Sequence, residues 1–317
     1  MSGFVEKMKD KVINGGKITK EEAKQLYFCD LDELTNASCE IRNKFCGNVF
    51  DFCAIVNAKS GMCSENCKFC AQSSFYNTTC QDKYSLNEKL ILEGAEICAK
   101  EGVKRYSMVA SGKSLNDAEV DKVCELSRKI REKMLVCISG GLMNKEQFVK
   151  LKAAGVDRIH CNVETSRNNF KNICTTHTYD DKIKAIHAAA EAGLEVCSGG
   201  IIGMGESLED RIDMAFDLRE LNIKSVPVNI LNPIKGTPFE QLKPLEYDEI
   251  MRTIAMFRFI LPDSLLRLAG GRKLLADRGE KCIKAGANAA ITGDMLTTVG
   301  VDFSSDIEMI RKMGFEY

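Results

Sequence analysis

Short apolar segments recur at regular intervals along the chain. Eight of them are rich in strand-forming residues, and they fall at residues 52–57, 105–110, 134–139, 158–163, 194–200, 225–231, 265–270 and 289–292. Between them lie longer segments whose apolar positions have helical spacing, such as residues 87–102. Strand and helix therefore alternate eight times. This alternation predicts an α/β fold, a (β/α)8 TIM barrel.

The ends of the predicted helices carry recognisable signals. Gly102, Gly155, Gly193 and Gly286 each stand where a helix would give way to the next strand. No linker rich in Pro, Gly or Ser divides the pattern, which indicates one barrel domain over residues 46–317. Residues 1–45 precede the first strand and contain a capping box, TKEE at 19–22. We expect them to form a helical N-terminal extension.

Composition limits the kinds of partner. The 317 residues are 44% hydrophobic and 28% charged, as in a globular protein with a large core. Lys and Arg total 44 against 45 for Asp and Glu, so no strong field would attract nucleic acid or an anionic membrane. A small-molecule partner is expected. The first residues resemble no signal peptide, and no apolar stretch is long enough to span a bilayer, which favours a cytoplasmic location.

Fifteen cysteines are too many and too scattered for a disulfide framework in a reducing compartment, so metal binding or catalysis should explain some of them. Cys63, Cys67 and Cys70 follow the first strand, at the end of a barrel that carries the chemistry. Three thiolates hold a four-iron cluster with one iron left open, whereas an electron carrier is normally closed by four. A zinc site would need a fourth ligand, and no histidine is near the motif in the sequence.

The C-x3-C-x2-C spacing, with Phe69 before the last cysteine, resembles the radical S-adenosylmethionine (SAM) superfamily. The resemblance implies that a 4Fe-4S cluster binds SAM through its open iron, with Phe69 close to SAM. It also implies that one electron splits the sulfonium to give a 5′-deoxyadenosyl radical, which abstracts an unactivated hydrogen. A closed barrel suits such chemistry because the radical must be kept from water.

Further segments narrow the resemblance. NVETS (162–166), TTHTYDDKI (175–183), VCSGGIIGMGES (196–207), SVPVNILNPIKGTP (225–238) and RLAGGR (267–272) are similar to the biotin synthase family, in order and position. This resemblance implies a sulfurtransferase that inserts sulfur into dethiobiotin, using two SAM molecules and a second, auxiliary iron–sulfur cluster as the sulfur source. It also implies an external electron donor of flavodoxin or ferredoxin type, and a homodimer.

The resemblance assigns residues to the two small molecules. Asn162 and Glu164, two apart on the predicted fourth strand, would grip the SAM ribose and the dethiobiotin ureido ring. Lys182 would meet the SAM carboxylate. Asn229 would hydrogen bond to the ureido group, or else to backbone groups of the barrel. His160 would contact the substrate, or else have a structural role in the barrel. A glycine-rich turn after the fifth strand would approach the SAM methionine moiety, through Gly199, Gly200, Gly203 and Glu206.

The auxiliary cluster is where the chain departs from the family pattern of three cysteines, on strands two, three and five, and one arginine. Strands three and five carry Cys137 and Cys197, and strand seven carries Arg267, but strand two has Ser107, a poor ligand for iron. The resemblance implies that Cys53, on strand one, faces the same cavity as Cys137 and Cys197. Three inward thiolates suit a four-iron cubane with one exposed iron better than a two-iron 2Fe-2S cluster. We expect that iron to carry an extra sulfide as the donor.

Other readings stay open at this point. Another radical SAM barrel, of the hydrogenase-maturation or thiazole-precursor type, would share the first cluster and the fold. An electron-transfer or metal-storage protein would use its cysteines in a closed cluster. The remaining cysteines are expected to be small apolar fillers without partners, and His177 to be structural; these cysteines include Cys29, Cys39, Cys80, Cys98, Cys124, Cys174 and Cys282.

Overall fold

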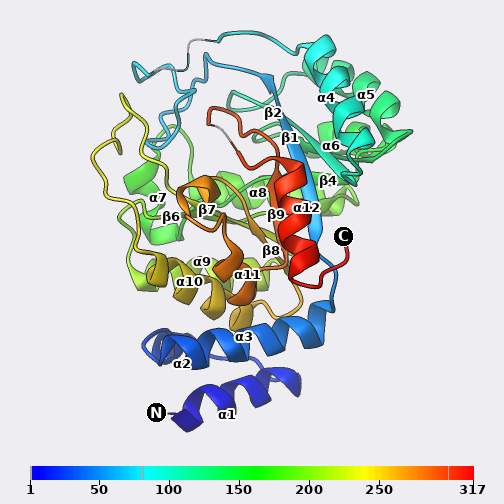
Figure 1. Ribbon diagram of the computed structural model, residues 1–317. Helices are drawn as coiled ribbons and strands as arrows, with labels where there is room; N and C mark the ends of the chain where they lie inside the picture. Colours follow the sequence, from blue (N-terminus) through cyan, green and yellow to red (C-terminus); the bar gives the residue numbers. More distant parts are fainter. Residues whose placement is uncertain (1, 79, 81, 299) are drawn as a thin grey trace.

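The structure is a computed structural model that describes residues 2–78, 80, 82–298 and 300–317. Parallel strands form a single sheet that closes into a barrel, with helices around it (Figure 1). The strands are β1 (Asp51–Lys59), β2 (Arg105–Ala110), β3 (Leu135–Ser139), β4 (Arg158–His160), β5 (Glu195–Cys197), β6 (Gly200–Ile202), β7 (Ser225–Ile230), β8 (Leu265–Leu268) and β9 (Ala289–Thr292). The predicted (β/α)8 barrel is confirmed.

Eight barrel positions hold nine strands because the fifth position is split. β5 and β6 both pair with β7, and Ser198 and Gly199 interrupt the strand between them. β1 lies between β2 and β9 in the sheet, and the pairing of β5 with β7 closes the ring. The sequence predicted one continuous fifth strand over residues 194–200. The strand is instead interrupted at Ser198 and Gly199, and the backbone of Gly199 lies so close to β7 that an added Cβ would be 2.0 Å from the carbonyl oxygen of Pro227.

Helices cover the outside of the barrel, and three more precede β1. The helices are α1 (Ser2–Ile13), α2 (Lys20–Tyr27), α3 (Leu31–Cys46), α4 (Glu88–Lys100), α5 (Asp117–Arg131), α6 (Lys145–Ala153), α7 (Arg167–Ile173), α8 (Tyr179–Glu191), α9 (Leu208–Glu220), α10 (Tyr247–Ile260), α11 (Glu280–Lys284) and α12 (Phe303–Lys312), with a short 3-10 turn at Arg272–Leu274. α3 packs on α10 and α1 packs on α3, below the strand ends from which β1 rises (Figure 1). The domain division after residue 45 stays a prediction.

The structure contains the capping box and the helix-ending glycines that the sequence predicted. In the box before α2, the Thr19 hydroxyl accepts a hydrogen bond from the Glu22 amide at 3.2 Å, and the Glu22 carboxylate accepts one from the Thr19 amide at 2.8 Å. Gly102, Gly155 and Gly193 follow α4, α6 and α8 with φ of 84°, 89° and 79°. A left-handed residue ends a helix with little strain only when it lacks a Cβ.

Apolar side chains fill the space between the outer faces of the strands and the helices, and they include Ile91, Leu126, Phe148, Ile254 and Phe257. The side chains inside the barrel are different. They are mostly thiol, polar or cationic, at Cys53, Arg105, Ser107, Cys137, Arg158, His160, Cys197, Asn229 and Arg267. The interior of a barrel is normally packed with branched aliphatic side chains, so this interior is built for binding. Among the described helices, none is both long and apolar enough to cross a membrane.

Candidate active site

A cavity of about 400 Å³ occupies the barrel interior and extends to the loops that follow the strands. It brings together side chains from all parts of the barrel sequence. Thirteen of the residues singled out from the sequence line it, namely Cys53, Cys63, Cys67, Phe69, Cys70, Cys137, His160, Asn162, Glu164, Lys182, Cys197, Asn229 and Arg267. Their individual roles stay predictions, but their convergence on one cavity is a property of the fold.

The loop after β1 folds its three cysteines into the upper part of the cavity. The Cys63 amide donates to the Gln72 carbonyl at 3.2 Å, the Ser74 amide donates to the Cys63 carbonyl at 2.9 Å, and a turn joins the Cys70 amide to the Cys67 carbonyl at 3.0 Å. Burial raises the pKa of the Cys70 thiol to about 11, so this thiol keeps its proton at neutral pH until a metal replaces it. Three convergent thiols facing a cavity fit a four-iron cluster with one open iron.

Asn162 and Glu164 meet in the cavity, although not on a strand. The sequence placed them on the fourth strand, but β4 ends at His160 and Glu164 has a left-handed φ of 70°. The Asn162 amide nitrogen donates to the Glu164 carboxylate at 3.3 Å, and its carbonyl oxygen accepts from the Gly199 amide at 3.0 Å. The pair is therefore held by side-chain hydrogen bonds and by the loop, and strand alternation does not explain its direction.

Lys182, near the start of α8, also points into this cavity, where it remains charged. Burial lowers the pKa of its ammonium group, but the neighbouring Cys161 and Glu164 outweigh burial and raise the pKa overall. A fixed positive charge close to the cysteine loop suits an anionic group such as a carboxylate.

The glycine-rich turn of β6 does not contribute side chains to the cavity. Among the described residues that line it, Gly199, Gly200, Gly203 and Glu206 are absent. The buried Glu206 carboxylate accepts hydrogen bonds from the amides of Gly203 and Met204 at 2.8 and 2.7 Å, and from Arg211 at 2.7 Å. Glu206 thus holds the turn together, and contact of the turn with SAM stays a prediction.

Asn229 on β7 has both a structural bond pattern and a place in the cavity. Its amide nitrogen donates to the Gly200 carbonyl at 3.0 Å, and its oxygen accepts from the Gly270 amide at 2.9 Å, so it bridges the backbones on either side of β7. One N–H and one lone pair of this amide remain for a ligand. The two roles considered from the sequence are therefore compatible, because the bridge also fixes the direction of the amide.

Three further thiols lie within the strands, deeper than the cysteine loop. Burial raises the pKa of Cys53 to about 12, and the negative charges of Cys137 and Cys197 add to the rise, which reflects their proximity. Burial also raises the pKa of Cys137, against a hydrogen bond from Ser107. For Cys197, burial acts in the same direction, but a hydrogen bond from His160 and nearby positive charges lower the pKa to about 6.

The base of the cavity is strongly cationic, which sequence reasoning missed apart from Arg267. Arg105 and Arg158 also line it, and all three guanidinium groups are buried. Arg267 forms an ion pair with Asp51 and donates to the Ala290 carbonyl at 3.1 Å. In the part of the chain that the structure describes, Nε and Nη1 of Arg105 find no hydrogen-bond partner. The sequence did contain a signal for these residues: each arginine lies two positions after an apolar residue in or beside a predicted strand, so both side chains should point to the same face of the sheet.

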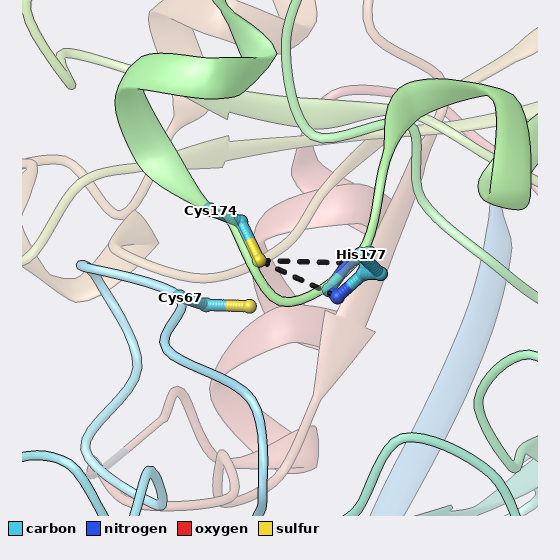
Figure 2. Close-up of side chains that lie close together, drawn as sticks. All are labelled: Cys67, Cys174 and His177. Atoms are coloured by element: carbon cyan, nitrogen blue, oxygen red, sulfur yellow. Dashed lines mark hydrogen bonds between the residues drawn. The ribbon is translucent and has the colours of Figure 1, made fainter.

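The structure also gives partners to two residues that the sequence left without any. Cys174 and His177 lie in the segment between α7 and α8, beside Cys67, and the three ligand atoms are within 4.8 Å of one another (Figure 2). The expectation that Cys174 is a filler without partners is wrong, and His177, although distant from the cysteine motif in the sequence, lies beside it in space. The segment lies more than 100 residues from the motif in sequence, and only the packing of one loop on the other joins them.

Solved structures share this fold. A methylornithine synthase matches with a TM-score of 0.84 and 20% identity, over 98% of this chain and 96% of that one. A maturase of the FeFe-hydrogenase matches with a TM-score of 0.85 and 19% identity, over 99% of this chain and 75% of that one. Identities this low support the barrel architecture alone.

Sequence comparisons are more specific. Residues 59–218 match the Radical SAM superfamily, and residues 227–316 match the Biotin and Thiamin Synthesis associated domain. A biotin synthase of Clostridium botulinum (strain Loch Maree / Type A3) is 53% identical over the full length of both chains. A biotin synthase of Brachyspira hyodysenteriae is 52% identical over 98% of this chain and 94% of its own. This chain belongs to the biotin synthase family of radical SAM enzymes.

Proposed function

We propose that this protein converts dethiobiotin to biotin by radical SAM sulfur insertion, with the sulfur supplied by an auxiliary iron–sulfur cluster. One observation carries the proposal. Two separate sets of three cysteines line a single cavity, one set in the loop after β1 and the other within β1, β3 and β5. An electron carrier needs no second open cluster site facing the first across a cavity that can hold a small molecule.

The loop cysteines Cys63, Cys67 and Cys70 hold the 4Fe-4S cluster that membership of the superfamily implies. When bound, this cluster and SAM supply a radical able to take hydrogen from a saturated carbon. The protein contributes position and charge. Lys182 offers its ammonium to the SAM carboxylate, and the fixed pair of Asn162 and Glu164 offers acceptors to hydroxyl groups of the ribose. Phe69 lines the same part of the cavity. The enclosing barrel excludes water.

For the auxiliary site we propose Cys53, Cys137 and Cys197 as ligands of a four-iron cluster that carries an extra sulfide. Ser107 supports this choice because its hydroxyl is hydrogen bonded to Cys137 and lacks a thiolate's affinity for iron. The three buried arginines at the cavity base support the extra sulfide, since their positive charge exceeds what Asp51 and Glu195 balance. Arg267 already forms an ion pair with Asp51. A charged guanidinium in an ion pair is better suited to balancing the charge of a cluster than to ligating its iron.

Dethiobiotin is proposed to lie between the two sets of cysteines. Its ureido group presents one carbonyl acceptor and two N–H donors, which the amides of Asn162 and Asn229 can pair. His160 on β4 lines the cavity next to Cys197 and can touch the substrate from below. An external flavodoxin or ferredoxin as electron donor, and a homodimer, remain expectations of the family.

Direct turnover tests the proposal. Protein reconstituted anaerobically with iron and sulfide, then supplied with SAM, a strong reductant and dethiobiotin, is expected to form biotin, and dethiobiotin is expected to stimulate 5′-deoxyadenosine formation. Mass spectrometry measures both products. If dethiobiotin neither binds nor stimulates SAM cleavage, the substrate is another molecule and this assignment fails. An electron carrier would cleave no SAM at all.

Substitution of the cavity amides tests substrate recognition. Asn162→Ala and Asn229→Ala should each weaken dethiobiotin binding by about 1 to 3 kcal/mol, because buried ureido groups are left unpaired. Equilibrium binding to the reconstituted protein measures the change. Asn14→Ala is the matched control, since Asn14 is exposed after the end of α1 and is not among the described residues that line the cavity.

Asn229 also bridges backbone, so its variant needs a second readout. SAM cleavage without dethiobiotin should persist in Asn229→Ala, and the thermal unfolding midpoint shows how much the lost bridge costs. Loss of basal SAM cleavage in this variant would assign Asn229 to the barrel structure instead of the substrate.

A further inference from the structure

Cys67, Cys174 and His177 form a compact group of metal-binding side chains that uses only one residue of the cysteine motif (Figure 2). The Cys174 sulfur lies 3.9 Å from Nε2 of His177, the ring nitrogen that is not in contact with Glu65. Around a tetrahedral zinc ion, a thiolate sulfur and an imidazole nitrogen are separated by about 3.6 Å. The observed distance is therefore close to that of two ligands of one ion, whereas cysteines on different irons of a cluster lie farther apart.

The histidine is already oriented as metal-binding histidines are. Nδ1 of His177 lies 2.5 Å from Oε2 of Glu65, a buried carboxylate, and that oxygen also accepts a hydrogen bond from the Thr176 hydroxyl at 2.8 Å. With Nδ1 donating its proton to Glu65, the lone pair stays on Nε2. A carboxylate behind the second ring nitrogen is the usual support of a zinc-binding histidine. The Phe170 ring packs edge-on against the imidazole and limits its rotation.

The two loops that carry the group are joined independently of any metal. The side-chain oxygen Oδ1 of Asn66 accepts hydrogen bonds from the backbone amides of Thr175 and Thr176 at 2.9 and 3.2 Å. Asn66 is the residue before Cys67, and the threonines separate Cys174 from His177. These bonds hold the sulfur of Cys67 close to the other two ligands. Most of the conformational entropy of the two loops is therefore lost on folding, before an ion binds.

We infer that Cys67, Cys174 and His177 bind a single zinc ion in the cluster-free protein, with Glu65 as the second-shell support of His177. Two thiolates and one imidazole favour zinc over ferrous iron, both by ligand type and by the general order of affinities. Because Cys67 is also a ligand of the 4Fe-4S cluster, zinc and the cluster exclude each other. The site thus makes zinc an antagonist of cluster installation. It does not depend on the proposed sulfur insertion.

Zinc titration of the full-length protein tests the site. Iron is removed by anaerobic chelation under reduction, and Zn²⁺ alone is added in competition with a chromophoric chelator. We expect one tight ion per chain, with X-ray absorption showing two sulfur and at least one nitrogen neighbour. Cys174→Ser and His177→Ala should each raise the Kd more than about 100-fold, and Glu65→Gln about 10- to 100-fold.

The controls separate this site from the cysteine loop. Cys161→Ser removes a buried thiol outside the group and should bind zinc as the wild type does. If Cys63, Cys67 and Cys70 held the ion instead, Cys63→Ser and Cys70→Ser would weaken zinc binding and Cys174→Ser would not. That pattern overturns the inference, as does an equal Kd for Cys174→Ser and Cys161→Ser. Circular dichroism of each cluster-free variant shows that the fold is kept.

A second measurement tests whether bound zinc prevents assembly of the 4Fe-4S cluster. One equivalent of zinc, added before iron and sulfide, should slow the growth of the four-iron absorption band in the wild type. The same addition should have little effect on Cys174→Ser, which keeps Cys63, Cys67 and Cys70 for the cluster. Equal slowing in both proteins would show that zinc competes through the cysteine loop, contrary to the inference.

Discussion

Replacing Cys63 or Cys70 by alanine is expected to abolish 5′-deoxyadenosine formation, down to the background of protein-free controls. In the proposed site each of the three loop thiols would ligate a separate iron, so the loss of one would leave the cluster with two protein ligands and destabilise it. Iron should fall from about eight to about four per chain if the auxiliary cluster is retained. Anaerobic reconstitution followed by iron, acid-labile sulfide and 5′-deoxyadenosine analysis measures all three quantities.

Cys98→Ala is the matched control for this loss. Cys98 is a half-buried thiol on α4, and it is not among the described residues that line the cavity. The control should keep its iron and its SAM cleavage. SAM cleavage at the wild-type rate in Cys63→Ala or Cys70→Ala would contradict the assignment of the motif to the SAM-binding cluster.

Cys53→Ala is expected to separate the two clusters. The variant should keep 5′-deoxyadenosine formation, because the cysteine loop is intact, and it should lose biotin formation together with about four irons per chain. The reason is the position of the side chain: Cys53 lies within β1, ten residues before Cys63, and lines the cavity together with Cys137 and Cys197. Mössbauer spectra and iron counts of wild type and variant measure the difference.

The iron content of the wild type could contradict this prediction. A total near six irons per chain, with a two-iron signal that survives in Cys53→Ala, would show that Ser107 or another group completes an ordinary two-iron site. Ser107→Cys should not be needed for activity if three thiolates already suffice. Cys124→Ala, which removes a buried thiol on α5 away from the cavity, controls for a general effect of losing a core sulfur.

The sequence determined the features that depend on local order. Apolar runs and helical periodicity predicted the eight barrel positions because each element buries one face whatever its distant neighbours are. Glycines marked the helix ends because a left-handed residue after a helix is strained with any side chain. The C-x3-C-x2-C spacing predicted the cluster loop because all the proposed ligands belong to one short segment of the chain.

Only the tertiary structure decided which distant segments meet. Strand alternation indicates the face on which a side chain lies, but register and barrel closure set its neighbours across the barrel. They place Cys53, Cys137 and Cys197 in one cavity beside three buried arginines. The interruption between β5 and β6 lies where Gly199 comes close to the backbone of β7, a contact that no local pattern contains. The approach of Cys174 and His177 to Cys67 results from the packing of two loops, so it could not be predicted from the spacing of either segment.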